Sequence, residues 1–195
     1  MAYDKELLAQ KLMRWEGFVA GYALPTWESI PDFGLYMDQV VVLLGQYLDF
    51  IPAPADGKDS FVTASTINNY VRLKLMPPPV KKKYGRAHIA YLVMILTLKQ
   101  SLSIADIGHL LPVDPDEAEV QGLYAGFCEK FAQAQGQFRG KLQHAVQAVD
   151  AAPDADTAAG QLILDCALDA AFNALLAGRL IRLNNGDEKT EKAKD

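Results

Sequence analysis

TASTINNYVRLKLMPPPVKKKYGR, residues 63–86, is the stretch on which the fold and function predictions depend. It combines a polar segment, three consecutive prolines and a run of three lysines, and it holds no acidic residue. From residue 60 to residue 105 the chain carries seven Lys and Arg and no Asp or Glu, which leaves 12 of the 19 basic residues and all 24 acidic residues elsewhere. In a chain of net charge -5, this local excess is typical of a surface that binds a polyanion.

The first part of this stretch predicts a helix over about residues 63–75. Thr63 or Ser65 can cap its first turn. At about 100° per residue, Ile67, Val71 and Leu75 share one face. The opposite face carries hydroxyl, amide and guanidinium groups, which can bind base edges and phosphates: Ser65, Asn68, Asn69 and Arg72, with Thr66 in support. Taken alone, such a helix is also compatible with a polar surface that only faces water.

The second part predicts a basic wing over residues 77–86. The prolines Pro77–Pro79 lack an amide proton and cannot continue a helix, so the chain turns there and projects a basic loop beside the helix. Winged helix-turn-helix proteins hold DNA with this combination, the helix in the major groove and the loop on the backbone. The expected phosphate contacts are Lys74, Lys81, Lys82, Lys83, Tyr84 and Arg86.

Hydrophobic periodicity predicts an all-α chain with further helices over residues 4–22, 35–48, 87–100, 103–111, about 114–149 and 156–183. The helix over 87–100 is almost wholly apolar and is expected to be buried. Pro-containing segments over 24–33 and 51–60 are expected to be a connector and a loop. We therefore predict a helix-turn-helix domain with its N-terminal helix over 1–115, a C-terminal long-helix hairpin over 116–183, used for dimerisation or an effector, and a disordered tail over 184–195.

Two rows of side chains repeat every seven residues in the first C-terminal helix: Tyr124, Phe131, Phe138 and Ala145, and Cys128, Gln135, Leu142 and Val149. Such a seam requires a partner helix, and the following helix is the expected one. The hairpin is either intramolecular or part of a homodimer; we expect the homodimer, because symmetric DNA regulators need one. A small-molecule effector site stays open, since Tyr124, Phe127, Phe131 and Phe172 could line it.

Enzymatic chemistry is not indicated. We find no nucleophile elbow, phosphate-cradling glycine loop, metal-ligand spacing or close carboxylate pair, and we expect no cofactor. The two cysteines, Cys128 and Cys166, are expected to be buried free thiols. Asp165, Asp169 and Arg179 interrupt the longest apolar segment, and no signal peptide is recognised, so we expect a cytoplasmic protein without a membrane span.

VTASTINNYVRLKLMPPP, the following KKKYGRAHIAYLVMILTLKQSLSIADIGHLL, and LYMDQ at Leu35–Gln39 resemble the bacterial family catalogued as domain of unknown function 1836. The resemblance covers about residues 24–111 and implies a transcriptional regulator.

The same stretch is more distantly similar to the DNA-binding head of MerR-type regulators, which implies a winged helix-turn-helix fold. Thr66, Tyr70, the turn Leu75-Met76-Pro77-Pro78, Arg86 and the segment Ser103–Ile107 match that pattern. Asn68 and Asn69 replace an Arg-Tyr pair, Lys74 stands where the pattern has glycine, and the 51–60 loop is longer than the usual turn.

The sequence therefore predicts a homodimeric, sequence-specific regulator that binds double-stranded DNA. The alternative is a non-enzymatic scaffold module whose basic stretch docks an acidic protein partner.

Overall fold

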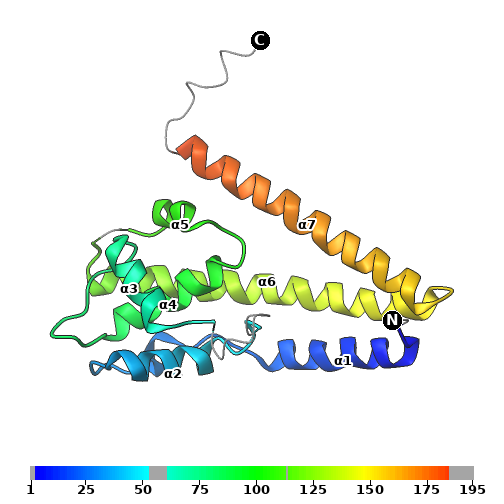
Figure 1. Cartoon of the computed structure of the whole chain (residues 1–195), viewed down its shortest axis with the longest axis horizontal. Coiled ribbons are helices and arrows are strands. Elements are labelled where there is room, and N and C mark those ends of the chain that lie inside the picture. Colours follow the sequence, from blue (N-terminus) through cyan, green and yellow to red (C-terminus); the bar gives the residue numbers. More distant parts are fainter. Residues whose placement is uncertain (1–2, 53–60, 113, 185–195) are drawn as a thin grey trace, which may run out of the picture. The chain divides into compact units, whose positions relative to one another are not determined.

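The computed structural model describes residues 3–52, 61–112 and 114–184, which form seven α-helices, one short 3-10 helix and no β-strand (Figure 1). The all-α prediction is confirmed. Most elements begin and end within a few residues of their predicted bounds, whereas most of the 51–60 loop and residues 185–195 of the predicted tail lie outside the described residues. The elements are α1 (Lys5–Gly21), η1 (Trp27–Ser29), α2 (Met37–Tyr47), α3 (Ala64–Arg72), α4 (Arg86–Leu98), α5 (Ile104–Leu110), α6 (Glu117–Ala151) and α7 (Ala155–Asn184).

Side-chain caps fix the starts of several helices. Thr63 Oγ1 accepts a hydrogen bond from the amide of Thr66 at 3.2 Å, and Ser103 Oγ accepts one from the amide of Asp106 at 3.1 Å. Asp116 Oδ1 accepts from the amide of Glu119 at 2.8 Å, while the Glu119 carboxylate accepts from the amide of Asp116. These bonds satisfy amides that have no partner within the helix. The predicted cap at Thr63 is confirmed, and Ser103 and Asp116 cap α5 and α6.

Contacts divide the chain into two compact units, which we describe separately. One comprises residues 1–24 and 126–171, and the other residues 25–125 and 172–195. Helix α1 therefore belongs to the same unit as residues 126–171, while the end of α7 belongs to the same unit as the basic stretch; the predicted boundary near residue 115 stays a prediction.

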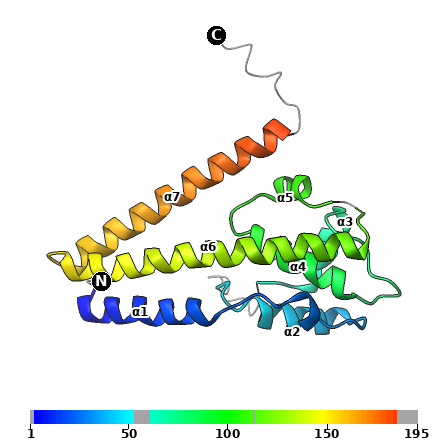
Figure 2. The same ribbon diagram turned by 180° about the vertical axis from the view of Figure 1, so that it is seen from behind.

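In the first unit, α1 covers the heptad seam of α6. The ring of Trp15 meets Phe138 edge-on at 5.2 Å between centroids, and Tyr22 meets Phe131 at 5.8 Å. Figure 2 shows α1 running beside this part of α6. The seam was expected to face the following helix, α7. Most of the seam faces α1, more than 100 positions earlier in the sequence. At its C-terminal end Val149 packs with Ala9 of α1 and also with Ala158 and Leu162 of α7, so the expected partner covers that end.

The polar position within the seam has a structural role. Gln135 Nε2 donates to the carbonyls of Val19 and Tyr22, the latter at 2.6 Å, and so satisfies carbonyls at the C-terminal end of α1. One turn further, the Arg139 guanidinium donates to Glu16 Oε1 at 2.9 and 3.0 Å. The amide at position 135 therefore fixes the register of α1 against α6.

The core of the second unit is α4, whose residues Ile89–Leu96 are at most 2% exposed, as the apolar run predicted. Helix α2 packs against both α4 and α3. The Tyr91 hydroxyl donates to the Pro112 carbonyl at 2.7 Å, and burial, with a smaller contribution from Glu119, raises its pKa to about 12. The Tyr70 hydroxyl is also buried, but it has no hydrogen-bond partner among the described residues.

Helix α7 departs from two expectations. Cys166 on α7 is exposed and Cys128 on α6 is half-buried, so neither is the buried thiol that the sequence indicated. By length and composition alone, residues 155–183 would also suffice to cross a membrane, although no such segment was expected. The reason is that an 18-residue segment such as 161–178 holds only two charged residues, Asp165 and Asp169, and both arginines follow it.

Candidate nucleic-acid interface

Helix α3 ends at Arg72, three residues before the predicted end and well before the prolines. Lys74 has a left-handed backbone with φ of 56°, the Lys74 amide donates to the Val71 carbonyl, and the Leu75 amide donates to the Tyr70 carbonyl, both at 3.0 Å. This pair of bonds is the Schellman motif, which usually has glycine at the left-handed position. Position 74 therefore has a backbone requirement that glycine usually meets, and here a lysine meets it.

The predicted wing is a minimal β-hairpin. Val80 and Lys83 exchange both backbone hydrogen bonds, at 3.0 and 2.9 Å, and Lys81 and Lys82 form the two-residue turn with φ of 49° and 64°. Positive φ at both turn residues defines a type I′ turn, for which Asn-Gly is the preferred sequence. All three lysines of the run are exposed. The turn thus displays positive charge on a backbone that lysine adopts only at a cost.

A segment before α2 anchors this hairpin. Leu35 and Tyr84 exchange two backbone hydrogen bonds of 2.9 Å, which continue the hairpin's pairing. A Cβ atom added at Gly34 would lie 2.8 Å from Lys83 Cβ, closer than real Cβ atoms approach. The Lys83 ammonium lies 5.3 Å from the centre of the Tyr36 ring, within cation–π range. Gly34 is therefore needed for the close approach of the wing, a role that the sequence analysis missed.

His88 fixes the other end of the wing. Its Nδ1 accepts a hydrogen bond from the Gly85 amide at 3.1 Å, and its Nε2 lies 3.1 Å from the Pro78 carbonyl. Because Nδ1 accepts, Nε2 carries the proton and donates to the carbonyl; this tautomer is assigned from the hydrogen-bond network. Sequence reasoning missed this role as well, although a histidine three residues after the glycine that precedes a helix is the signal that could have shown it.

The polar face of α3 is exposed at Ser65, Asn68 and Arg72. Asn69 is half-buried, and its side-chain oxygen accepts a hydrogen bond from Arg72 Nη2 at 2.7 Å. Thr66 is half-buried too, with its hydroxyl 3.0 Å from that of Thr63. Asn69 thus orients the guanidinium of Arg72, whereas the sequence suggested two independent base-reading groups.

Two predicted phosphate contacts are not on this surface. Tyr84 is 2% exposed, and burial raises its pKa. Arg86 is half-buried: its Nε donates to the Ile30 carbonyl at 2.9 Å, and its guanidinium carbon lies 5.7 Å from the centre of the Trp27 ring. Both residues are engaged in the protein itself, because the hairpin pairs with the connector and turns these two side chains toward it.

The start of α3 and the lysine turn border the same groove. Thr63 and Ala64 line it from α3, and Lys82 lines it from the turn. The groove has a volume of about 910 Å³, and the rest of its lining comes from Val62 and from residues of or next to α2: Tyr36, Met37, Asp38 and Val41. Asp38 is the one acidic residue in this lining. The structure therefore brings the two halves of the basic stretch to one opening.

Comparison with known protein families identifies this region. The family described as "Domain of unknown function (DUF1836)" matches residues 25–127, more than half of the chain. The chain belongs to this family. No curated protein and no solved structure matches the chain. The DUF1836 region includes α2, the α3–wing stretch, α4 and α5, so the whole candidate interface lies inside it, whereas α1 and α7 lie outside.

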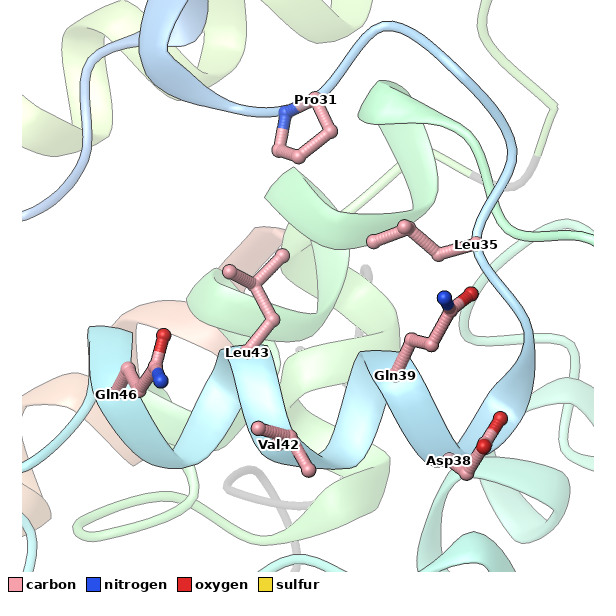
Figure 3. A pocket seen from close by; sticks show the side chains of 7 residues that line it. All are labelled: Pro31, Leu35, Asp38, Gln39, Val42, Leu43 and Gln46. Carbon is pink, nitrogen blue, oxygen red and sulfur yellow. The ribbon is translucent and has the colours of Figure 1, made fainter.

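A second hollow of the DUF1836 region lies along α2 and has a volume of about 350 Å³. Figure 3 shows side chains of α2 and of the segment before it surrounding this space: Pro31, Leu35, Asp38, Gln39, Val42, Leu43 and Gln46. The Gln39 side chain already makes a hydrogen bond, because its oxygen accepts from the Tyr36 amide at 2.9 Å. The lining includes no cation, so a phosphate placed here would meet no opposite charge.

The four aromatic residues considered for an effector site have separate surroundings. Tyr124 is buried, with its hydroxyl donating to the Pro25 carbonyl at 2.8 Å and its ring 6.4 Å from that of Trp27. Phe131 packs on Tyr22 as described above, Phe127 is half-buried and Phe172 is 70% exposed. The effector site stays a prediction from sequence.

Proposed function

We propose that this protein is a sequence-specific transcriptional regulator that binds double-stranded DNA in the cytoplasm with a winged, MerR-like helix-turn-helix. Helix α3 acts as the recognition helix, and the hairpin around Lys81 and Lys82 acts as the wing. The observation that carries the proposal is that both elements border one groove, within a stretch of 46 residues that has seven basic and no acidic residues.

Backbone conformation supports the same surface. Lys74, Lys81 and Lys82 are the only non-glycine residues with positive φ in the described part of the chain, and all three lie in this stretch. Each such residue costs about 1–2 kcal/mol relative to a right-handed conformation. Outliers of this kind cluster at functional sites, where the side chain matters more than the backbone preference. Glycine adopts these backbone angles at a lower cost, so the presence of lysine at each position indicates that its side chain has a function.

Arg72 is the best-placed group for reading bases. It is exposed, and the hydrogen bond that it donates to Asn69 Oδ1 holds its guanidinium in one orientation before DNA arrives. A guanidinium can donate two parallel hydrogen bonds to O6 and N7 of guanine, the commonest specific contact in the major groove. Asn68 is exposed and can bind adenine in the same manner.

The proposed DNA surface therefore differs from the sequence prediction by two residues. Tyr84 and Arg86 are left out, because they hold the wing on the connector. The remaining groups divide into residues on the polar face of α3, where Asn69 acts by orienting Arg72, and phosphate-facing lysines: Ser65, Thr66, Asn68, Asn69 and Arg72, and Lys74, Lys81, Lys82 and Lys83.

Fluorescence anisotropy with labelled duplexes tests this assignment. The full chain should bind a mixed-sequence duplex at low salt, and the logarithm of its affinity should fall with the logarithm of salt at a slope of about -0.9 per phosphate contact. Replacing Lys81–Lys83 with alanine should flatten that slope and weaken all duplexes alike. After selection of a preferred site, Asn68→Ala should instead reduce discrimination at one base pair by roughly 1–3 kcal/mol.

A matched control removes charge elsewhere. The triple variant Lys11→Gln, Arg14→Gln and Lys130→Gln loses three exposed charges from α1 and α6, outside both the DUF1836 match and the proposed surface, and should retain the salt slope. Absence of duplex binding at low salt would reject DNA binding and favour the acidic-partner scaffold. Equal binding by the wing variant and the parent would reject the wing.

A further inference from the structure

Helix α7 presents a large apolar face to solvent. The exposed fractions of Leu168, Phe172, Leu175 and Leu176 are 49%, 70%, 65% and 59%. Isolated exposed hydrophobic residues are ordinary, but a contiguous patch of this kind marks an interaction site. Since residues seven apart lie on one stripe, the face consists of three adjacent stripes: Asp165, Phe172 and Arg179; Leu168, Leu175 and Arg182; and Asp169, Leu176 and Leu183.

The acidic and basic residues of this face lie at opposite ends of it. Asp165 and Asp169 precede the apolar centre, and Arg179 and Arg182 follow it. In a parallel pair of identical helices, each acid would face the same acid and each arginine the same arginine, which is repulsive. In an antiparallel pair centred between Phe172 and Leu176, Asp165 lies opposite Arg182 of the second copy.

The same centring matches the other groups. Asp169 lies opposite the second copy's Arg179, and the phenyl ring of Phe172 lies opposite Leu175 and Leu176, because these pairs have nearly the same midpoint in the sequence. The arrangement is self-complementary: each contact occurs twice, as a two-fold symmetric interface requires.

We propose that α7 pairs with α7 of a second copy of this chain in an antiparallel, two-fold symmetric dimer through this face. The proposal deepens the homodimer expected of the regulator by naming its helix, face and direction, and in that sense rests on the proposed function. It does not depend on any contact with DNA.

The size of the face fits a dimer at the lower limit of stability. Its large apolar side chains, the four central ones and Leu183, expose roughly 80–100 Å² each, so a pair buries about 1,000 Å². Asp169 already accepts from Lys141 at 2.6 Å through Oδ2. Both partners of this ion pair are more than half exposed, so the bond costs little to rearrange.

A lipid bilayer fits this face less well. Although α7 is long and apolar enough to cross a membrane, the two acids and two arginines lie among the leucines and not on the opposite side. Either a spanning or a surface-lying helix would bring Asp165 and Asp169 into hydrocarbon, which is costly. Antiparallel pairing buries the same leucines and supplies each charge with its opposite.

Sedimentation velocity of the full chain tests the pairing. The parent should be a dimer at micromolar concentration, and Phe172→Arg should raise the dimer dissociation constant by tenfold or more. Ile163→Arg is the matched control: Ile163 is 61% exposed but lies on the opposite side of α7, so its substitution should leave the dimer intact. Asp165→Arg should weaken the dimer, and the swap Asp165→Arg with Arg182→Asp should restore it.

Cysteine cross-linking tests the direction. In a background with Cys128→Ser and Cys166→Ser, Leu175→Cys should form an intermolecular disulfide readily, because residue 175 lies close to the two-fold axis. Leu168→Cys should not, because its two copies are about 17 Å apart along an antiparallel pair at about 1.5 Å per residue. A parallel pair would cross-link both.

The proposal is overturned if the parent is a monomer, whether or not that monomer sediments with lipid vesicles. It is also overturned if Phe172→Arg and Ile163→Arg change the dimer dissociation constant alike, or if Leu168→Cys cross-links as well as Leu175→Cys. Circular dichroism of each variant confirms that the helices are retained. Duplex binding is measured on the same samples: a dimer that binds no DNA would reject the proposed function and support this interface.

Discussion

The lysine turn offers the sharpest test, because one change should move stability and DNA binding in opposite directions. The double substitution Lys81→Asn and Lys82→Gly installs the sequence that a type I′ turn prefers and removes two exposed charges. If the two lysines are present for their side chains, the variant should fold more stably and bind DNA more weakly.

The size of each effect follows from the backbone angles and the charges. At residue 82, with φ of 64°, glycine relieves about 1–2 kcal/mol of left-handed strain and gives back about 0.4–1 kcal/mol through a more flexible unfolded chain. Asparagine recovers part of the strain at residue 81, so the free energy of unfolding should rise by about 1 kcal/mol, or about 2–4 °C in Tm. Losing two phosphate contacts should reduce the salt slope by about 1.8. If the parent and the variant bind equally at 1 M salt, this difference in slope makes the variant's affinity roughly 60-fold lower than the parent's at 0.1 M salt.

Thermal and urea unfolding followed by circular dichroism measure the first effect, and anisotropy titrations at several salt concentrations measure the second. Lys81→Arg with Lys82→Arg keeps both the charge and the strain, and should match the parent in both assays. Lys11→Gln with Lys130→Gln removes the same charge from α1 and α6 and should leave the salt slope unchanged.

Either of two results would refute the reasoning. A variant that is less stable than the parent would show that the turn is not strained at these residues. A variant that is more stable but keeps its salt slope would show that the turn lysines do not contact phosphates. The backbone strain at these lysines would then no longer support DNA binding.

Individual contacts lead to four further predictions. Arg86→Ala should lower the free energy of unfolding by about 2–3 kcal/mol, through the lost bond to a carbonyl and the lost ring contact, without flattening the salt slope; a flattened slope at equal stability would return this residue to the DNA surface. Tyr70→Phe removes a buried hydroxyl without a partner and should be neutral or stabilise by about 1 kcal/mol, whereas Tyr91→Phe removes a satisfied one and should destabilise by about 1 kcal/mol at pH 7. Because folding raises the pKa of Tyr91 from 10.0 to about 12, its neutral form contributes stability that is complete below pH 10 and lost as the pH rises toward 12; urea midpoints should therefore fall less steeply over that range in Tyr91→Phe than in the parent. Gly34→Ala should displace the wing through Lys83 and weaken DNA binding, while Gly45→Ala, which meets no neighbouring atom, should not; equal binding by both variants would mean that the wing tolerates the shift.

The helical content and the caps were accessible from the sequence because they depend on local chemistry. Ser103 followed by Asp106, and Asp116 followed by Glu119, specify helix starts within four residues. The end of α3 was not accessible in the same way. The prolines suggested an end near residue 75, but Lys74 takes the left-handed conformation that usually requires glycine, and ends the helix earlier.

The candidate interface shows the same distinction among its residues. The basic charge of the stretch and the polar face of α3 are properties of residue order, and they were predicted correctly as exposed at Ser65, Asn68 and Arg72. From the sequence alone, Tyr84 and Arg86 could contact phosphates as their lysine neighbours could. Only their pairing with Leu35 and Ile30 removes them from the surface, and those partners lie about 50 positions earlier in the chain.

By itself, the sequence of residues 63–86 determined that a polar helix precedes a basic turn without nearby acids, because charge and periodicity are carried by neighbouring residues. Tertiary structure decided which side chains of that stretch face solvent, and which helix covers the seam of α6. A heptad pattern states that a helix needs a partner but carries no information on which helix supplies it. Here α1 covers most of the seam, since Gln135 and Arg139 find carbonyls and a carboxylate there at the matching register, while α7 covers its end at Val149.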